Sequence, residues 1–276
     1  MSGNGENDRM TTTDPVQAQR DYACGTVKLM VWHVWDLYHD PADGASIQEN
    51  LDRRVDIMRK TALFDGRHPA GGLNPPIAEW DRLKEELAVL IQGVGAGEET
   101  GALEEDCWAL LWPFVEPTLD QTRDKLTVSQ ERPYRCWSYE WNQQPSRSIG
   151  LHFSNAFQSD SPFGQRRDEL IDDLRRLLED AGRKHPQVER VTCGSWLNQF
   201  APFNALFPAS WEESFVPVYD YWATYGWWGQ YMTHQGRFHR RNGNLFRRHR
   251  RHPFVAGVSS CSWKAALAHV QALGQT

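Results

Sequence analysis

Four polar side chains in the second half of the sequence are of types that acid–base and acyl-transfer chemistry uses. They are His152 and Asn155 and, further along the chain, Ser195 and Asn198. An imidazole titrates near neutral pH and can act as a general base, whereas a hydroxyl can donate a hydrogen bond or act as a nucleophile. The two amides can bind a carbonyl or a developing oxyanion. The competing interpretation is structural: a buried histidine bonded to the backbone, with Ser and Asn capping turns.

The elements around these residues predict that they share one edge of a sheet. Apolar and polar residues alternate over 148–155, which indicates a strand, and 188–193 has the composition of a second short strand. Between them an apolar stripe predicts a long helix that Ser161 caps and Gly182 ends. We therefore expect a right-handed βαβ unit at 148–197, whose parallel strands end at the same edge of the sheet.

The charge is divided sharply along the chain. The whole protein carries −6, but residues 221–276 contain no Asp or Glu and carry +8, so residues 1–220 carry −14. The basic element at 234–252 contains arginine without lysine, which favours bidentate contacts to phosphate. We therefore expect a polyanionic or phosphate-bearing partner, with tRNA as one candidate. The candidate phosphate-binding side chains are Arg237, Arg240, Arg241, Arg247, Arg248, Arg250 and Arg251.

Neighbouring residues indicate how this basic element is built. Asn242-Gly243 is a strong turn dipeptide and predicts that the run is not one continuous helix. Trp227 and Trp228 precede the run and are candidates for stacking on bases or on a cofactor. The alternative is that the arginines pair with the acidic N-terminal 220 residues, within the chain or across an oligomer.

A short Ser-Trp-Leu step follows the second predicted strand. The order is Leu151-His152-Phe153 in a strand, a long amphipathic helix, a strand, and then Cys193-Gly-Ser195-Trp196-Leu197 and Phe207-Pro208. Over 149–215 this order resembles the C-terminal domain of GNAT-like acyltransferases, and it is similar to bacterial proteins containing "GSWL-N…FP". The resemblance implies transfer of an acyl-type group from a phosphate-containing donor.

A glycine-rich segment, Gln92-Gly-Val-Gly95-Ala-Gly97, matches the short pattern that cradles the pyrophosphate of acetyl-CoA in GNAT acetyltransferases. Such a loop must follow a strand and open a helix, so that backbone N–H groups meet the phosphates. Here it follows the predicted helix 77–92. This context favours a glycine-rich helix exit over a nucleotide-binding loop.

The chain divides into a disordered tail at 1–20, an N-terminal α/β region at 21–147 and a C-terminal α/β region at 148–276. The fold class that follows is α/β with a mixed sheet, and α+β is the alternative. In the N-terminal region, β-branched and aromatic residues predict a buried strand at 25–35. Helices are predicted at 46–63, where Ser46 and Glu49 form a capping box, at 77–92, and at 102–112, where Pro113 ends the helix.

A metal site is not expected. His33, Asp36, His39 and Asp40 are ligand types at short spacing, but on an extended strand Asp36 points away from the two imidazoles. Five scattered cysteines, never in a CxxC pair, argue against a disulfide framework and against a zinc ribbon.

These observations support two hypotheses of different classes. In the first, the protein is a transferase that moves an acyl or aminoacyl group from acyl-CoA or aminoacyl-tRNA to a small acceptor, with His152 as base. In the second, it is a non-catalytic RNA-binding or assembly protein that uses the arginines. No apolar stretch approaches the roughly 18 residues that cross a bilayer, and no signal peptide is recognisable, so we expect no membrane partner and a cytoplasmic location.

Overall fold

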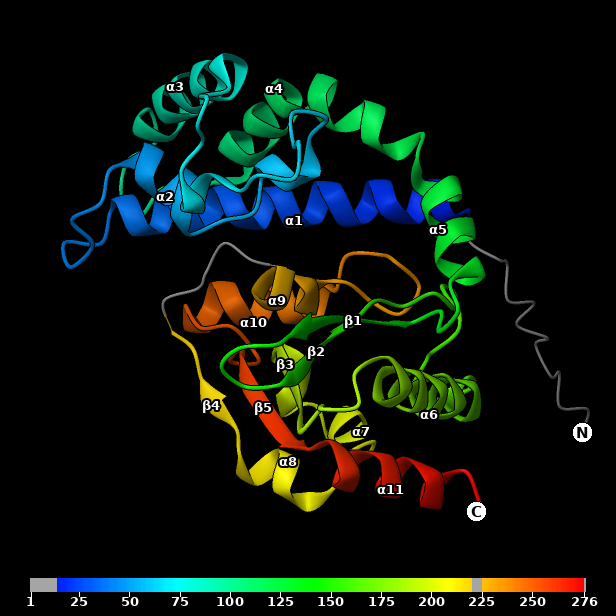
Figure 1. The fold of residues 1–276 in the computed structure, drawn as a ribbon. Helices are drawn as coiled ribbons and strands as arrows, with labels where there is room; N and C mark the ends of the chain where they lie inside the picture. Colours follow the sequence, from blue (N-terminus) through cyan, green and yellow to red (C-terminus); the bar gives the residue numbers. More distant parts are fainter. Residues whose placement is uncertain (1–13, 220–224, 276) are drawn as a thin grey trace, which may run out of the picture.

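A layer of helices covers a five-stranded mixed sheet in the computed structural model, which describes residues 14–219 and 225–275 (Figure 1). Two buried apolar clusters correspond to these parts: one lies among the helices, and the other lies between the sheet and the helices beneath it. This arrangement of helices and mixed sheet is an α/β fold, as the sequence predicts.

Helix α1 (Pro15–Tyr38) lies at the centre of the helical layer. Asp14 caps it by accepting a hydrogen bond from the Val16 amide at 3.2 Å, and Pro15 occupies the first turn. Every residue from Leu29 to Asp36 is buried, because α2, α3, α4, α5 and α10 all contact this helix. The predicted strand at 25–35 is therefore wrong: a helix enclosed on all sides has the same unbroken apolar run as a buried strand.

Helix α1 begins inside the predicted N-terminal tail. Residues 15–20 belong to the helix, and the rest of the predicted tail, residues 1–13, lies outside the described residues. The predicted α/β region 21–147 is helical as far as Arg132 and contains one strand, Trp137–Asn142, near its end.

The other helices of this layer follow the predictions in part. The Ser46–Glu49 capping box is present, but α2 ends at Arg53 and a short 3-10 turn follows. Helix α4 continues through Pro113, contrary to prediction, because an i, i+4 stripe of buried side chains holds it together while the proline faces solvent. The elements are α2 (Ile47–Arg53), α3 (Ala78–Gln92), α4 (Gly101–Leu119), α5 (Thr122–Glu131) and 3-10 turns Met58–Lys60 and Pro69–Gly71.

The sheet has the strand order β1-β2-β3-β5-β4. Strands β2 and β3 are parallel, with Ile149 opposite Val191, and every other pair is antiparallel. The strands are β1 (Trp137–Asn142), β2 (Ser148–Phe153), β3 (Arg190–Ser195), β4 (Val216–Pro217) and β5 (Gly257–Ser262). Strand β1 pairs with β2 throughout, so the predicted boundary between 147 and 148 would separate two partners of one sheet.

Helix α6 (Arg167–Lys184) connects the parallel strands, which confirms the predicted strand–helix–strand unit. Both predicted helix ends are wrong. The Ser161 carbonyl instead accepts hydrogen bonds from Gly164 and Arg166, in a turn that precedes the helix. Gly182 lies inside α6, where a Cβ would come within 2.4 Å of the Trp263 ring, so this glycine permits close packing with α11 (Trp263–Leu273).

The C-terminal elements join the two layers. Helix α11 lies beside α6 under the sheet, whereas α9 and α10 lie between the sheet and α1 (Figure 1). Buried side chains of α9 and α10 belong to the apolar cluster of the N-terminal helices. The predicted C-terminal region, 148–276, therefore contributes to both cores. The elements are α7 (Ala201–Asn204), α8 (Ala209–Glu213), α9 (Tyr225–Trp228), α10 (Arg240–His249) and 3-10 turns Trp196–Gln199 and Gly229–Tyr231.

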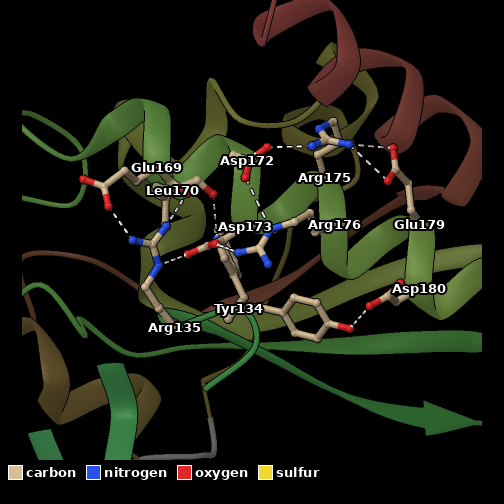
Figure 2. Close-up of polar contacts among 11 residues, drawn as sticks. Tyr134, Arg135, Glu169, Leu170, Asp172, Asp173, Arg175, Arg176, Glu179 and Asp180 are labelled. Atoms are coloured by element: carbon tan, nitrogen blue, oxygen red, sulfur yellow. Dashed lines mark hydrogen bonds and ion pairs between the residues drawn. The ribbon is translucent and has the colours of Figure 1, made fainter. Parts of the chain in front are cut away.

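A buried carboxylate fastens α6 to the start of β1. The Asp173 side chain is fully buried, and Figure 2 shows Arg135 and Arg176 both reaching it. The Arg135 Nε atom lies 2.7 Å from Asp173 Oδ2, and the same guanidinium pairs with Glu169. Charges removed from water are tolerated only when they are paired and hydrogen-bonded. The backbone of Arg135 adopts a left-handed conformation, with φ 41°.

We expect the substitution Asp173→Asn to destabilise the protein by about 2 to 3 kcal/mol, because it removes a fully buried carboxylate and its charge-assisted hydrogen bonds, while Arg135 and Arg176 each keep a second carboxylate partner. Urea unfolding followed by circular dichroism measures the change. The matched control is Asp172→Asn on the same helix. Its carboxylate is half exposed and pairs with Arg175 at 2.6 Å, so its loss should cost less than about 1 kcal/mol. Equal effects of the two substitutions would contradict this account.

Candidate functional site

Three of the four predicted rim residues are bonded to the surrounding structure. The Asn198 amide donates to the carbonyls of Cys193 and Gly257 at 2.8 and 2.9 Å, and its oxygen accepts from the Trp211 indole. The Ser195 hydroxyl accepts from the Leu197 amide at 3.1 Å and caps the following turn. These contacts match the structural interpretation of both residues.

Asn155 joins the end of β2 to the basic element. Its amide donates to the His234 carbonyl at 3.0 Å, and its oxygen accepts from the Phe157 amide at 2.9 Å. The side chain therefore holds the turn after β2 against the segment that precedes α10. The bonds of Asn155, like those of Asn198, go to backbone groups and stabilise loops.

His152 is the one exposed member of the predicted cluster, with 60% of its side chain accessible. Its Nε2 atom lies 3.7 Å from Glu140 Oε2 on the neighbouring strand. Side chains alternate between the two faces of a sheet. Because Ile149 lies opposite Val191, the alternation places His152 on the face opposite to that of Ser195. The parallel strands do end at one edge, as predicted, but the structure does not bring these two side chains together.

The basic element forms a helix across the predicted turn. Helix α10 begins after His239, whose Nδ1 accepts from the Asn242 amide, and it includes both Asn242 and Gly243. A Cβ on Gly243 would lie 2.6 Å from the Phe238 ring, so glycine serves tertiary packing at this position. The predicted turn at Asn242-Gly243 is wrong, because packing against Phe238 and the Asn242 bond to the Gln230 carbonyl override the local preference. The run 234–252 is nevertheless not one continuous helix, since α10 begins only at Arg240.

The arginines that face the N-terminal helices pair with acidic side chains. Arg247 makes a bidentate contact to Glu104, with both distances at 2.8 Å. Arg250 lies 2.8 Å from Asp36, and Arg240 lies 3.5 Å from Asp21. For these three residues the structure shows the intramolecular alternative: they attach α10 to α1 and α4.

The outer arginines are different. Arg241, Arg248 and Arg251 are exposed and form no ion pair with any residue that the structure describes. Arg241 and Arg248 are seven positions apart, so two helical turns place them on one side of α10. Arg237, also exposed, lies in the preceding turn, where its amide donates to the Thr233 hydroxyl. We call these three exposed arginines, Arg241 and Arg248 on α10 and Arg251 just beyond its C-terminal end, the basic surface of α10.

The two tryptophans expected to stack on a ligand are part of the core. Trp227 and Trp228 have exposed fractions of 2% and 0%. Trp228 packs edge-on against Phe246 at 5.8 Å, and Trp227 lies beside His252. Rings buried in this way cannot reach a base or a cofactor, so the prediction that they bind one is wrong. Their apolar character fits core packing equally well, which is why the sequence did not separate the two roles.

The glycine-rich segment after Gln92 follows helix α3 and precedes α4. Gly97 adopts a left-handed backbone conformation, with φ 84°. Since no strand precedes the segment, it lacks the strand–loop–helix arrangement of a pyrophosphate-binding loop. It is the glycine-rich helix exit that the sequence context favoured.

The helical geometry of α1 brings together residues that a strand would separate. His33 and Asp36 on α1 and Asp40 in the loop after it line one cavity, together with Asp43, Arg54 and Arg250. Within the described residues, no group of three or more His, Cys, Asp or Glu side chains is arranged to hold a metal ion. The expected orientation of Asp36 away from His33 is wrong because the segment is a helix. A helical period of 3.6 residues places His33 and Asp36 on one face of α1.

Burial controls the ionisation of this region. It lowers the pKa of His33 to about 3, with a further contribution from Arg54, and it lowers the pKa of His252 well below its usual value. The Phe246 ring lies against both imidazoles, at 4.9 and 4.6 Å between ring centres. Burial also raises the pKa of Asp36, and the nearby Arg250 partly opposes this effect. Both histidines are therefore neutral parts of the core at neutral pH.

Comparison with known proteins adds no relative. A scan against protein-family models found no match, and neither the search of curated proteins nor the search of solved structures found one. In the part of the chain that the structure describes, no helix is long and apolar enough to cross a membrane.

We expect acidification to destabilise the protein before most carboxylates titrate. Between the unfolded pKa of His near 6.5 and the depressed folded values, the unfolded chain binds more protons, so the free energy of unfolding falls as the pH falls. From pH 7 to about pH 5.5 the two histidines should cost about 2 kcal/mol. Urea titrations at the two pH values measure it.

The variant His33→Leu should show about half of this pH dependence, whatever its stability at pH 7. The control His234→Gln changes an exposed histidine and should keep the full dependence. An unchanged pH dependence in His33→Leu would show that His33 protonates freely in the folded protein.

Proposed function

We propose that the protein binds the phosphate backbone of a structured RNA, such as tRNA, through the basic surface of α10. The observation that carries this proposal is the exposure of Arg241, Arg248 and Arg251 without a carboxylate partner in the described chain. Guanidinium groups suit phosphate because they present several N–H donors in a planar fork.

The inner side of α10 supports this function by fixing the helix. The bidentate pair of Arg247 and Glu104 and the burial of Phe246 hold α10 against the helical layer. A rigid helix holds its outer arginines in place, so less side-chain and backbone freedom is lost on binding. The acidic N-terminal region thus neutralises the inner arginines and leaves the outer ones for a partner.

The structure also suggests which kind of contact to expect. Trp227, Trp228 and Tyr231 are buried, so they offer no platform on which unpaired bases could stack. Contacts would then go to phosphates and ribose, as in recognition of duplex RNA by shape. Sequence preference should be weak, and affinity should fall with salt because counterions are released.

We expect the triple variant Arg241→Gln, Arg248→Gln and Arg251→Gln to bind tRNA more weakly and with a shallower salt dependence. If each arginine contacts one phosphate, the slope of log K against log salt should shrink by about 2 to 3 units. Fluorescence anisotropy with labelled tRNA at several salt concentrations measures both quantities. Thermal unfolding checks that the variant is folded.

The matched control removes the same charge elsewhere: Arg132→Gln, Arg167→Gln and Lys264→Gln, three side chains that take part in no ion pair among the described residues. It should keep the slope of the parent protein. Equal loss in both triple variants would mean that net charge alone attracts RNA. Absence of tRNA binding by the parent protein at low salt would reject the function.

We propose acyl or aminoacyl transfer as a second candidate, favoured by the pair of His152 and Glu140. The Glu140 carboxylate lies 3.7 Å from the imidazole, where it can help to orient a general base. The resemblance of 149–215 to GNAT-like acyltransferases supports the same chemistry. The donor would be aminoacyl-tRNA or acyl-CoA, and a small molecule would be the acceptor. We also propose a cytoplasmic location, because all five cysteines are free thiols, as in a reducing compartment.

Deacylation of the two donors by the intact protein tests this candidate. The substitution His152→Gln should slow release of free CoA or free tRNA about 100-fold or more, since a general base contributes about that much. His234→Gln is the matched control and should have no effect. If the parent protein deacylates neither donor, or if His152→Gln is as fast as the parent, the transfer hypothesis is rejected.

A further inference from the structure

A cavity of about 310 Å³ lies at the C-terminal end of α1, apart from the basic surface of α10. This volume falls within the range of about 300 to 1,000 Å³ that small-molecule sites occupy. Three separate parts of the chain build it: α1 and the loop after it, the end of α2, and the end of α10. The charged and polar side chains that line it are His33, Asp36, Asp40, Asp43, Arg54 and Arg250.

The carboxylates in this cavity keep acceptor capacity. Asp40 Oδ1 accepts from the Ala42 amide at 2.9 Å, and Asp43 Oδ1 accepts from the Ala45 amide at 3.0 Å. Asp43 Oδ2 is buried and accepts no hydrogen bond from the described residues. A buried acceptor without a donor is costly, so a donor supplied by a ligand would be bound favourably.

Arg250, at the end of α10, also lines the cavity. It caps α10 in a left-handed backbone conformation, with φ 53°, and its Nη2 lies 2.8 Å from Asp36 Oδ1. Such a conformation is unfavourable for a non-glycine residue and is commonly maintained at functional sites. A guanidinium has five N–H donors, so the contact with Asp36 leaves donors for an anionic group.

The two signs of charge define the ligand class. Three carboxylates and two guanidinium groups line the same space, and His33 is neutral there. A simple anion would meet the carboxylates, and a simple cation would meet the arginines, at a cost for each like-charge contact. A molecule that carries an ammonium and a carboxylate satisfies both sets.

We propose that this cavity binds a free α-amino acid. Asp40 and Asp43 accept hydrogen bonds from its ammonium group, and Arg54 and Arg250 donate to its carboxylate. The proposal is independent of RNA binding, because the basic surface of α10 contributes none of these side chains.

Thermal-shift measurements with the standard amino acids, followed by calorimetry on the best of them, test this site. We expect at least one free amino acid to raise Tm in a saturable way, by mass action on the folded state. Its decarboxylated amine and its N-acetyl derivative should each bind about tenfold more weakly or worse, because each lacks one of the two charges. Rejection follows if no amino acid binds, or if the amine or the N-acetyl derivative binds as tightly.

The double variant Asp40→Asn and Asp43→Asn keeps the side-chain oxygens that accept from Ala42 and Ala45 but removes both charges. Binding should fall at least tenfold, whereas the control double variant Asp106→Asn and Asp168→Asn, which changes two exposed carboxylates, should bind as the parent does. Arg54→Gln tests the other end of the ligand: it should weaken the amino acid and leave the amine unaffected. Parent-like binding by the Asp40 and Asp43 variant, or by Arg54→Gln, overturns the proposal.

Discussion

The burial of α1 on all sides is the constraint on which the rest of the structure depends. Its middle residues, Leu29 to Asp36, are all buried, with exposed fractions of at most 8%. Neighbouring elements must therefore enclose this part of the helix and satisfy its polar groups. The N-terminal helices supply most of this cover. The remainder comes from α10, which brings Phe246 to His33 and Arg250 to Asp36. The position of α10 is thereby fixed by its contacts with α1.

Local sequence signals predict an element correctly where tertiary packing favours the same element. The alternation in β2, the apolar stripe of α6 and the capping box at Ser46 all specify their elements. Prediction fails where packing overrides a local signal. Pro113 stays inside a helix because the stripe on its other side is buried, and Gly243 belongs to a helix because Phe238 occupies the space beside it.

In the candidate site, too, the local features were predictable from the sequence and the tertiary contacts were not. The predicted parallel pairing of β2 and β3 is confirmed, but the alternation of side chains along these strands separates His152 from Ser195. The arginines of the basic element divide into inner ones that pair with carboxylates and outer ones that, among the described residues, do not. That distinction depends on the positions of Glu104 and Asp36, which lie far away in sequence. Contacts between such distant segments have no local signature.

The sharing of one core by the two ends of the chain has a consequence for synthesis. The apolar cluster around α1 is complete only when Trp227, Trp228, Tyr231, Phe246 and Ala256 are in place. These residues are synthesised after all the helices from α1 to α8 and the strands from β1 to β4. Until then the N-terminal helices of the protein lack part of their apolar cover. Its final folding step is long-range in sequence, although most of its elements are local helices.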